Sequence, residues 1–182
     1  MVNYNPVQTT PFSKKEKVMA RLWRFVWCVF YRLSPWMFYK YRVFLLRLFG
    51  ARVSYKARPA NSAFVEYPWN LIMKDYASLG EWSWIYCLDQ VCLDEYSCVG
   101  QYCKLVSGGH DYKSMEFGMN SAPITLGRGV WLTSEVTVLM GVEIGDYSVV
   151  GAKSLVLKNI SMNKVAGGIP CKLIGERFDE IK

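Results

Sequence analysis

The chain has one histidine among 182 residues and lacks a long uncharged run. In its aromatic N-terminal part the longest uncharged stretches are Phe25–Tyr31 and Leu33–Tyr39, well below the roughly 18–20 residues that span a bilayer. A single imidazole cannot build a three-histidine zinc centre, and the six cysteines include no C-x-x-C pair. The sequence therefore predicts neither a membrane-spanning helix nor a bound metal.

Acidic residues are nearly missing from the first part of the chain. Residues 1–55 hold ten Lys/Arg and one acid, Glu16, whereas residues 56–182 hold twelve bases and fourteen acids. The formal net charge of +7 is thus a property of the N-terminal segment. Neither a basic stripe nor a nucleic-acid-binding motif accompanies it, so we expect no nucleic-acid partner.

A secretory signal is also missing, because residues 1–16 are polar and contain no apolar core. We interpret these residues as a loosely ordered arm. Without a signal, the six cysteines are expected to be reduced thiols in the cytoplasm.

Aliphatic residues recur at every sixth position in the second half of the chain: Leu126, Leu132, Val138, Ile144, Val150 and Val156. The fifth position of each block of six is small or β-branched: Val130, Val136, Val142, Ser148, Ser154 and Ile160. A helix repeats near 3.6 residues and a strand alternates every two, so neither explains this period. Period six fits a coil of three short flat faces per turn, with the aliphatic residue pointing into a thin prism.

A looser run of the same spacing precedes the regular one. It comprises Val53, Pro59 and Val65, then Met73, Leu79 and Ile85, then Leu93, Val99 and Leu105. Together the two runs predict about five coils. The interval from Leu105 to Leu126 is not a multiple of six, so residues 106–125 are expected to leave the prism as a surface loop.

The loop contains the lone histidine, His110, directly after Gly108 and Gly109. Imidazole is the side chain best suited to accept a proton near neutral pH. The glycines allow close approach of the backbone to a ligand. His110 is therefore the candidate catalytic residue.

Residues 17–49 mix aromatic, aliphatic and basic side chains. Ser34 as an N-cap and Pro35 at the first helical position split them into two predicted helices, about 14–33 and 35–48. Two alternatives remain for their apolar faces. Either they pack on the prism or a neighbouring subunit, or the segment lies peripherally on the inner membrane. In the second case phosphates meet Arg21, Arg24 and Arg32, and the headgroup boundary takes Trp23, Trp27 and Phe30.

After Ile160 the repeat ends, and Gly167, Gly168 and Pro170 predict a turn. A short C-terminal helix from about Cys171 is expected to close the end of the prism.

Six motifs relate the run from Tyr67 to Arg177 to a known family. They are Tyr67-Pro68-Trp69-Asn70-Leu71, Ser107-Gly108-Gly109-His110-Asp111-Tyr112, Val130-Trp131-Leu132, Gly141-Val142-Glu143-Ile144-Gly145, Val150-Gly151-Ala152 and Gly167-Gly168-Ile169-Pro170-Cys171-Lys172. With them the chain resembles the hexapeptide-repeat acyltransferases, and among these the colanic-acid-biosynthesis type of the maltose/galactoside O-acetyltransferase group. The resemblance implies an all-β, left-handed parallel β-helix. We accordingly expect a helical segment at 1–50, the β-helix at 51–165 with a catalytic loop at 106–125, and a turn and helix at 166–182.

The resemblance also implies a function, which is acetyl transfer from acetyl-CoA to a hydroxyl of a bacterial surface polysaccharide or its lipid-linked precursor. It makes His110 the general base and the backbone N–H of Ser134 the donor to the developing oxyanion. It implies a homotrimer with inter-subunit active sites. The implied CoA contacts are Ser134, Ala152, Lys158 and Lys172, and the implied acceptor contacts are Tyr86, Asp89, Asp111, Met119 and Trp131.

Two other functions stay open at this point. An N-acetyltransferase of an amino sugar needs the same base and the same CoA groove. A non-catalytic β-helix scaffold needs neither, and His110 is then incidental.

Overall fold

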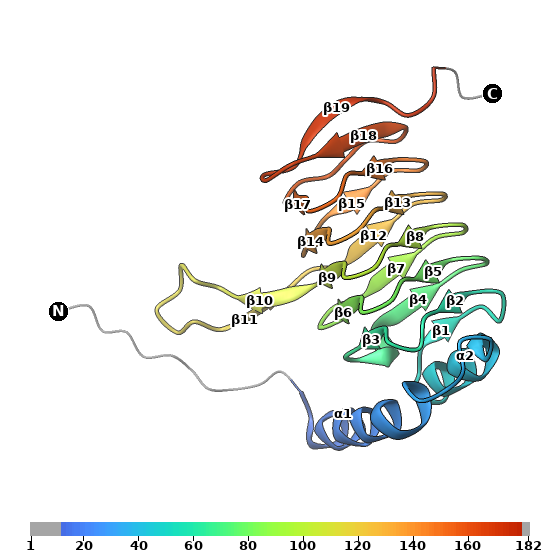
Figure 1. Cartoon of the computed structure of the whole chain (residues 1–182). Coiled ribbons are helices and arrows are strands. Elements are labelled where there is room, and N and C mark those ends of the chain that lie inside the picture. The colour runs from blue at the N-terminus through green and yellow to red at the C-terminus, as the bar shows by residue number, and fades with distance from the viewer. Residues whose placement is uncertain (1–11, 180–182) are drawn as a thin grey trace.

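A computed structural model describes residues 12–179 and shows a prism of stacked coils with helices beneath its first coil (Figure 1). The strands lie on three faces. The first face contains β1 (Arg52–Val53), β4 (Leu71–Met73), β7 (Val91–Leu93), β12 (Ile124–Leu126) and β15 (Glu143–Ile144). The second contains β2 (Arg58–Pro59), β5 (Ser78–Leu79), β8 (Cys98–Val99), β13 (Trp131–Leu132), β16 (Val149–Val150), β18 (Lys164–Gly167) and β19 (Lys172–Glu176). The third contains β3 (Phe64–Val65), β6 (Trp84–Tyr86), β9 (Lys104–Val106), β14 (Thr137–Leu139) and β17 (Leu155–Val156).

The six-residue repeat sets the register of every face. On the first face Met73 pairs in parallel with Val53 and with Leu93, and Leu126 pairs with Leu93 and with Ile144. The repeat aliphatics are buried, and so are the small fifth-position residues from Val130 to Ile160. The prediction of a three-faced parallel β-helix is confirmed, including the looser first coil.

The N-terminal segment forms α1 (Lys14–Val26), a π-helical turn η1 (Trp27–Tyr31) and α2 (Tyr39–Leu48), and a short 3-10 turn η2 (Pro68–Asn70) follows later. Ser13 begins α1 through a capping box with Glu16. Residues 1–11 of the expected N-terminal arm lie outside the described part of the chain.

The predicted start of the second helix was wrong, because α2 begins at Tyr39 and its N-cap is Phe38, not Ser34. The Ser34 hydroxyl donates to the Tyr31 carbonyl at 2.6 Å and closes the preceding helix instead. The buried Arg42 guanidinium donates to Ser34 Oγ at 3.0 Å and to the carbonyls of Pro35 and Trp36 at 2.8 and 2.6 Å. These bonds hold the residues after Ser34 as a turn.

The helices cap the open end of the prism. Strand residues of each coil donate backbone N–H groups to the carbonyls of the next coil, as in Ser54 N to Met73 O. The strand carbonyls of the first coil therefore have no preceding coil from which to accept a hydrogen bond. Side chains of the helical segment fill that role, namely Trp23 to Val65 at 2.5 Å, Trp27 to Ala63 at 2.9 Å, Arg42 to Pro59 at 2.9 Å and Arg47 to Val53 at 2.7 Å. For Trp23 and Trp27 the structure therefore favours the first of the two alternatives, packing on the prism.

The far end is closed by a strand where a short helix was expected. β19 pairs antiparallel with β18 over Lys164–Gly167 and Lys172–Glu176. The physical reason is that β18 presents an open edge of N–H and C=O groups, which an adjacent strand can pair and a helix backbone cannot. Across residues 12–179, every helix is too short or too polar to cross a bilayer.

Candidate functional site

His110 lies on a hairpin that leaves the prism between the third and fourth coils (Figure 1). The hairpin consists of β10 (Gly108–His110) and β11 (Met119–Ser121), paired antiparallel with His110 opposite Met119. It emerges from the corner between the third and first faces, which we call the hairpin corner. Directly opposite residues of an antiparallel pair project from the same side, so His110 and Met119 share one side of the hairpin.

The root of the hairpin is buried and fixed. The Ser107 backbone N–H donates to the Tyr86 carbonyl at 3.0 Å, and the Ser107 carbonyl accepts from Ala122 N at 3.1 Å. The Asn70 side-chain amide donates to the carbonyls of Cys87 and Leu88 at 2.9 and 3.1 Å and holds the neighbouring loop. The hairpin thus starts from a rigid base even though its tip is exposed.

The His110 ring is held by one residue on the returning side of the loop. Its Nδ1 atom lies 2.9 Å from the Phe117 carbonyl oxygen, and the two rings stack with centroids 4.4 Å apart and planes 4° from parallel. A carbonyl only accepts, so Nδ1 carries the proton and donates, which leaves the Nε2 lone pair free. The imidazole is therefore oriented and set in the tautomer of a general base.

Sequence reasoning missed Phe117. It adopts a left-handed backbone conformation with φ of +48°, which is rare for an aromatic residue. No sequence signal marks such a position, since glycine or asparagine is the usual occupant.

The other predicted acceptor residues at the hairpin corner are Tyr86, Asp89 and Asp111. Asp89 Oδ2 accepts from Ser121 Oγ at 3.3 Å, which ties this carboxylate to the base of β11. Burial, and then the negative charge of Glu66, raise the pKa of Tyr86, so its phenol stays neutral and can donate. Asp111 accepts from Lys113 N at 3.0 Å and shapes the loop turn, whereas His110 Nδ1 bonds to the Phe117 carbonyl.

The remaining predicted residues lie elsewhere on the same chain. Ser134 and Ala152 stand at the corner between the second and third faces, and Trp131 and Lys172 lie on the second face. A face of about six residues is roughly 20 Å long, so Ser134 and His110 of one chain cannot meet on one reacting group. On one chain the predicted site residues therefore fall into two separate groups, which we call half-sites.

The predicted CoA contacts are open to a ligand. Within residues 12–179 the Ser134 N–H has no hydrogen-bond acceptor, and Ala152 is small and exposed. Lys158, at the hairpin corner, and Lys172 are exposed and form no ion pair with any described carboxylate. Arg177 differs from these two lysines, because its guanidinium donates to the Gly129 and Tyr147 carbonyls of its own chain at 2.8 and 3.0 Å.

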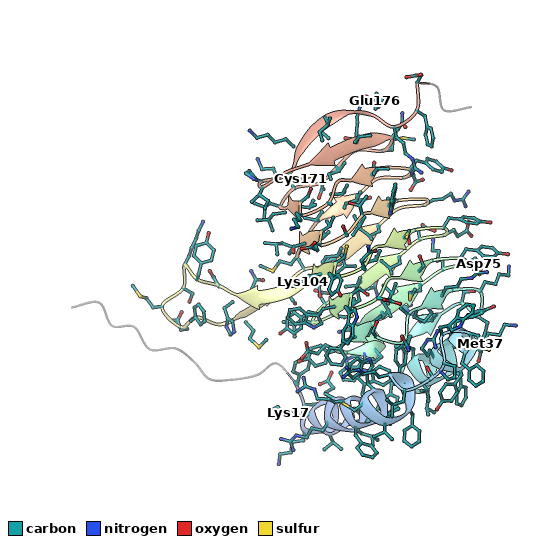
Figure 2. The ribbon with its side chains drawn as sticks, in the orientation of Figure 1. Lys17, Met37, Asp75, Lys104, Cys171 and Glu176 are labelled. Atoms are coloured by element: carbon teal, nitrogen blue, oxygen red, sulfur yellow. The ribbon has the colours of Figure 1, made fainter. Side chains whose placement is uncertain are left out.

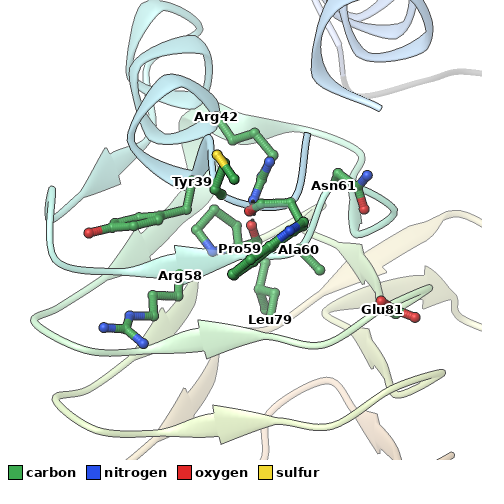
Figure 3. Close-up of a pocket in the computed structure, with 10 residues that line it drawn as sticks. Tyr39, Arg42, Arg58, Pro59, Ala60, Asn61, Leu79 and Glu81 are labelled. Atoms are coloured by element: carbon green, nitrogen blue, oxygen red, sulfur yellow. Dashed lines mark hydrogen bonds between the residues drawn. The ribbon is translucent and has the colours of Figure 1, made fainter. Parts of the chain in front are cut away.

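Other candidate sites are weaker. A cavity of about 500 Å³ lies between α2 and the second face, with Tyr39, Arg42, Arg58 and Leu79 in its lining, and no predicted catalytic residue borders it (Figure 3). Within the described residues no three His, Cys, Asp or Glu side chains gather as a metal site. Burial raises the pKa of Cys103 to about 11, so this thiol, which donates to the Thr133 carbonyl beside the Ser134 corner, stays protonated and is a poor nucleophile.

Comparison with known proteins gives consistent relatives. No family model matches the chain. The Escherichia coli K12 protein "Putative colanic acid biosynthesis acetyltransferase WcaF" is 38% identical over 168 residues, which are 92% of each chain. Escherichia coli K12 galactoside O-acetyltransferase is 52% identical over 64 residues, covering 35% of this chain and 32% of that protein.

Solved structures agree in fold. A Vibrio cholerae hexapeptide-repeat acetyltransferase complexed with acetyl coenzyme A superposes with a TM-score of 0.82 at 18% identity, covering 94% of both chains. A galactoside acetyltransferase in complex with coenzyme A gives 0.78 at 28% identity, covering 93% of this chain and 86% of that one. Figure 2 draws the side chains of the described residues on the ribbon.

Proposed function

The chain belongs to the hexapeptide-repeat acetyltransferases, and from that premise we propose that it transfers the acetyl group of acetyl-CoA to a sugar hydroxyl. The observation that carries the proposal is the His110–Phe117 contact, which leaves Nε2 of the only imidazole free to accept a proton. The long similarity to a relative named for colanic acid biosynthesis supports an acceptor in a bacterial surface polysaccharide or its lipid-linked precursor.

In the proposed reaction His110 Nε2 takes the proton of the acceptor hydroxyl as the hydroxyl oxygen attacks the thioester carbonyl carbon. The Ser134 N–H donates to the carbonyl oxygen while negative charge develops there. The carbon–sulfur bond then breaks, the protonated imidazole returns its proton to the sulfur, and the products are an acetyl ester and the CoA thiol. Both substrates are bound together, so positioning supplies much of the acceleration.

Completing this site requires a second copy of the chain. His110 and Ser134 lie at different corners of one prism, so the oxyanion donor that faces one His110 comes from a neighbour. The separation of the half-sites supports a homotrimer in which each groove between prisms joins the hairpin of one copy to the Ser134 corner of the next.

The remaining residues take binding roles in this groove. Ala152 keeps the corner small, so the pantetheine arm can lie against the backbone, and Lys158 and Lys172 meet the CoA phosphates. On the acceptor side Tyr86 and Asp89 hydrogen-bond sugar hydroxyls, and Met119 and Trp131 of the adjacent prism offer apolar contact to a sugar ring. Asp111 acts indirectly by shaping the loop.

The test is acetyl transfer from acetyl-CoA to a panel of oligosaccharide alcohols and their amino-sugar counterparts, with thiol release and product mass as readouts. We expect an ester product with an alcohol acceptor. Transfer only to amines would replace the proposal with N-acetylation, and the absence of transfer to either class would contradict it.

A further inference from the structure

The N-terminal helices carry a second apolar surface that the prism does not use. Its large side chains have between 37% and 74% of their surface exposed, and we call it the outer face: Val18, Leu22, Phe25, Val29, Phe30, Leu33, Phe38, Tyr41, Phe44 and Leu48. Figure 2 shows these helices beneath the first coil, where their far side faces away from the prism. An exposed apolar surface this large marks a binding site on a folded protein.

The exposed apolar residues of the outer face follow helical spacing and lie on a different side of the helices from the residues buried against the prism. In α1 the residues Val18, Leu22 and Phe25 follow each other at spacings of four and three, which places them on one side of a helix. Trp23, on the opposite side, is fully buried against the prism. In α2 Tyr41, Phe44 and Leu48 repeat the exposed stripe, while Val43 and Leu46 are buried. The segment is therefore apolar on two sides.

Basic side chains border the outer face. Lys14, Lys17, Arg21 and Lys40 are exposed and form no ion pair with a described carboxylate. The single acid of the segment, Glu16, is engaged in the Ser13 capping box. Arg24 and Arg32, which the membrane alternative assigned to lipid phosphates, contact the prism. Arg24 pairs with Glu66 at 3.2 Å, and Arg32 lies over the rings of Trp27 and Trp82.

The positive charge that borders the outer face determines which kind of partner can bind there. A second copy of the outer face would bring the same uncompensated positive charge against it, and like charges repel. An anionic bilayer offers apolar chains to the stripe and phosphates to its basic border at once. We propose that the outer face is a monotopic docking surface for an anionic phospholipid membrane. This proposal does not depend on the acetyl-transfer chemistry.

The docking geometry has a consequence for the rest of the molecule. With α1 and α2 on the membrane, the prism stands above it, and the His110 hairpin leaves the prism three coils up (Figure 1). Coils are about 4.8 Å apart, so the hairpin root, between the third and fourth coils, lies roughly 10–14 Å above the first coil. That height is within reach of the glycan on a lipid-linked acceptor.

The test is flotation of the full chain with phosphatidylglycerol-containing vesicles and with pure phosphatidylcholine vesicles. We expect binding to the first that salt weakens, and little binding to the second. Leu33→Glu, in the outer face, should lower partitioning at least tenfold. Leu173→Glu is the matched control, because Leu173 is also an exposed leucine, 60% against 74%, but lies at the far end of the prism. Arg21→Gln should lower partitioning about fivefold.

Circular dichroism and thiol release from acetyl-CoA in vesicle-free solution should be unchanged in Leu33→Glu, which separates this proposal from the catalytic one. Absence of wild-type flotation on anionic vesicles would overturn the membrane proposal. So would equal partitioning of Leu33→Glu and Leu173→Glu. A larger oligomer in sedimentation that Leu33→Glu dissociates, without vesicle binding, would assign the outer face to a second copy or another protein instead.

Discussion

Gly108 lies directly against the side chain of Leu88, so that a methyl group added at Gly108 would overlap the Leu88 side chain. Gly109, the next residue, has no atom within 4 Å of the same added methyl. The two adjacent glycines therefore have different roles. The absence of a side chain at Gly108 lets the hairpin pack closely on Leu88, whereas Gly109 borders open space beside His110.

This contrast gives a matched pair of variants. Gly108→Ala should displace the hairpin root and lower kcat at least tenfold, because a small misplacement of a catalytic group is costly. Gly109→Ala should change kcat less than about threefold, since the added methyl meets nothing in the chain. Steady-state acetyl-transfer kinetics measure both. Equal effects from the two substitutions would show that Leu88 does not set the position of His110.

The Phe117 ring gives a second prediction. Phe117→Ala keeps the backbone carbonyl but removes the stacked ring, and an aromatic pair contributes about 0.5–1.5 kcal/mol. We expect kcat to fall roughly threefold to tenfold with the KM for acetyl-CoA unchanged, and Phe117→Tyr to recover most of the rate. Met115→Ala, an exposed position in the same loop, is the control. An unchanged kcat in Phe117→Ala would mean that the stacking does not orient the base.

The sequence was sufficient to predict the prism and the position of His110 on a loop that leaves it, and the reason is physical. A six-residue repeat buries one aliphatic residue per face, so the pattern fixes the register from Val53 to Val156 without further information. The loop with His110 is visible as the break in that repeat. The sequence does not mark Phe117, because this residue orients His110 through its carbonyl oxygen and a left-handed backbone conformation.

The ends of the prism were harder to predict because the open edges there decide the structure. A helix was predicted from about Cys171, yet the residues after it form β19 because they pair with the open edge of β18. Ser34 before Pro35 looked like an N-cap, but hydrogen bonds from Arg42 bind that turn. Both outcomes depend on partners distant in sequence, which local propensity does not contain.

The N-terminal cap gives a stability prediction. Trp23→Phe removes the indole N–H from the Val65 carbonyl and leaves that buried acceptor unpaired. The free energy of unfolding should fall by about 1–3 kcal/mol. Trp36→Phe is the matched control, since Trp36 is 80% exposed and should change stability by less than about 0.5 kcal/mol. Denaturant titration compares the two, and equal stability would refute the capping role of Trp23.

The Ser134 N–H can be removed without disturbing its turn. The next residue, Glu135, has φ of +60°, as at the third position of a type II turn, where proline is favoured at the second. Ser134→Pro should therefore fold and lower kcat about 10²-fold or more. Gln101→Pro makes the same change one coil earlier, before Tyr102 with φ of +58°, and should retain activity.

Mixing two inactive variants tests whether the half-sites come from different copies. Co-expressed His110→Ala and Ser134→Pro chains should regain part of the activity, because some grooves then join an intact hairpin to an intact Ser134 corner. Mixed oligomers as inactive as either parent would place both residues in one subunit's site and contradict the shared groove.

The most direct measurement of the account is kcat for His110→Ala, with CoA affinity determined by calorimetry on the same protein. A general base contributes about 10²–10⁴-fold, so kcat should fall at least 10²-fold while CoA binding stays within about twofold. Turnover near the wild-type rate with intact CoA binding would contradict the assignment of His110 as the base.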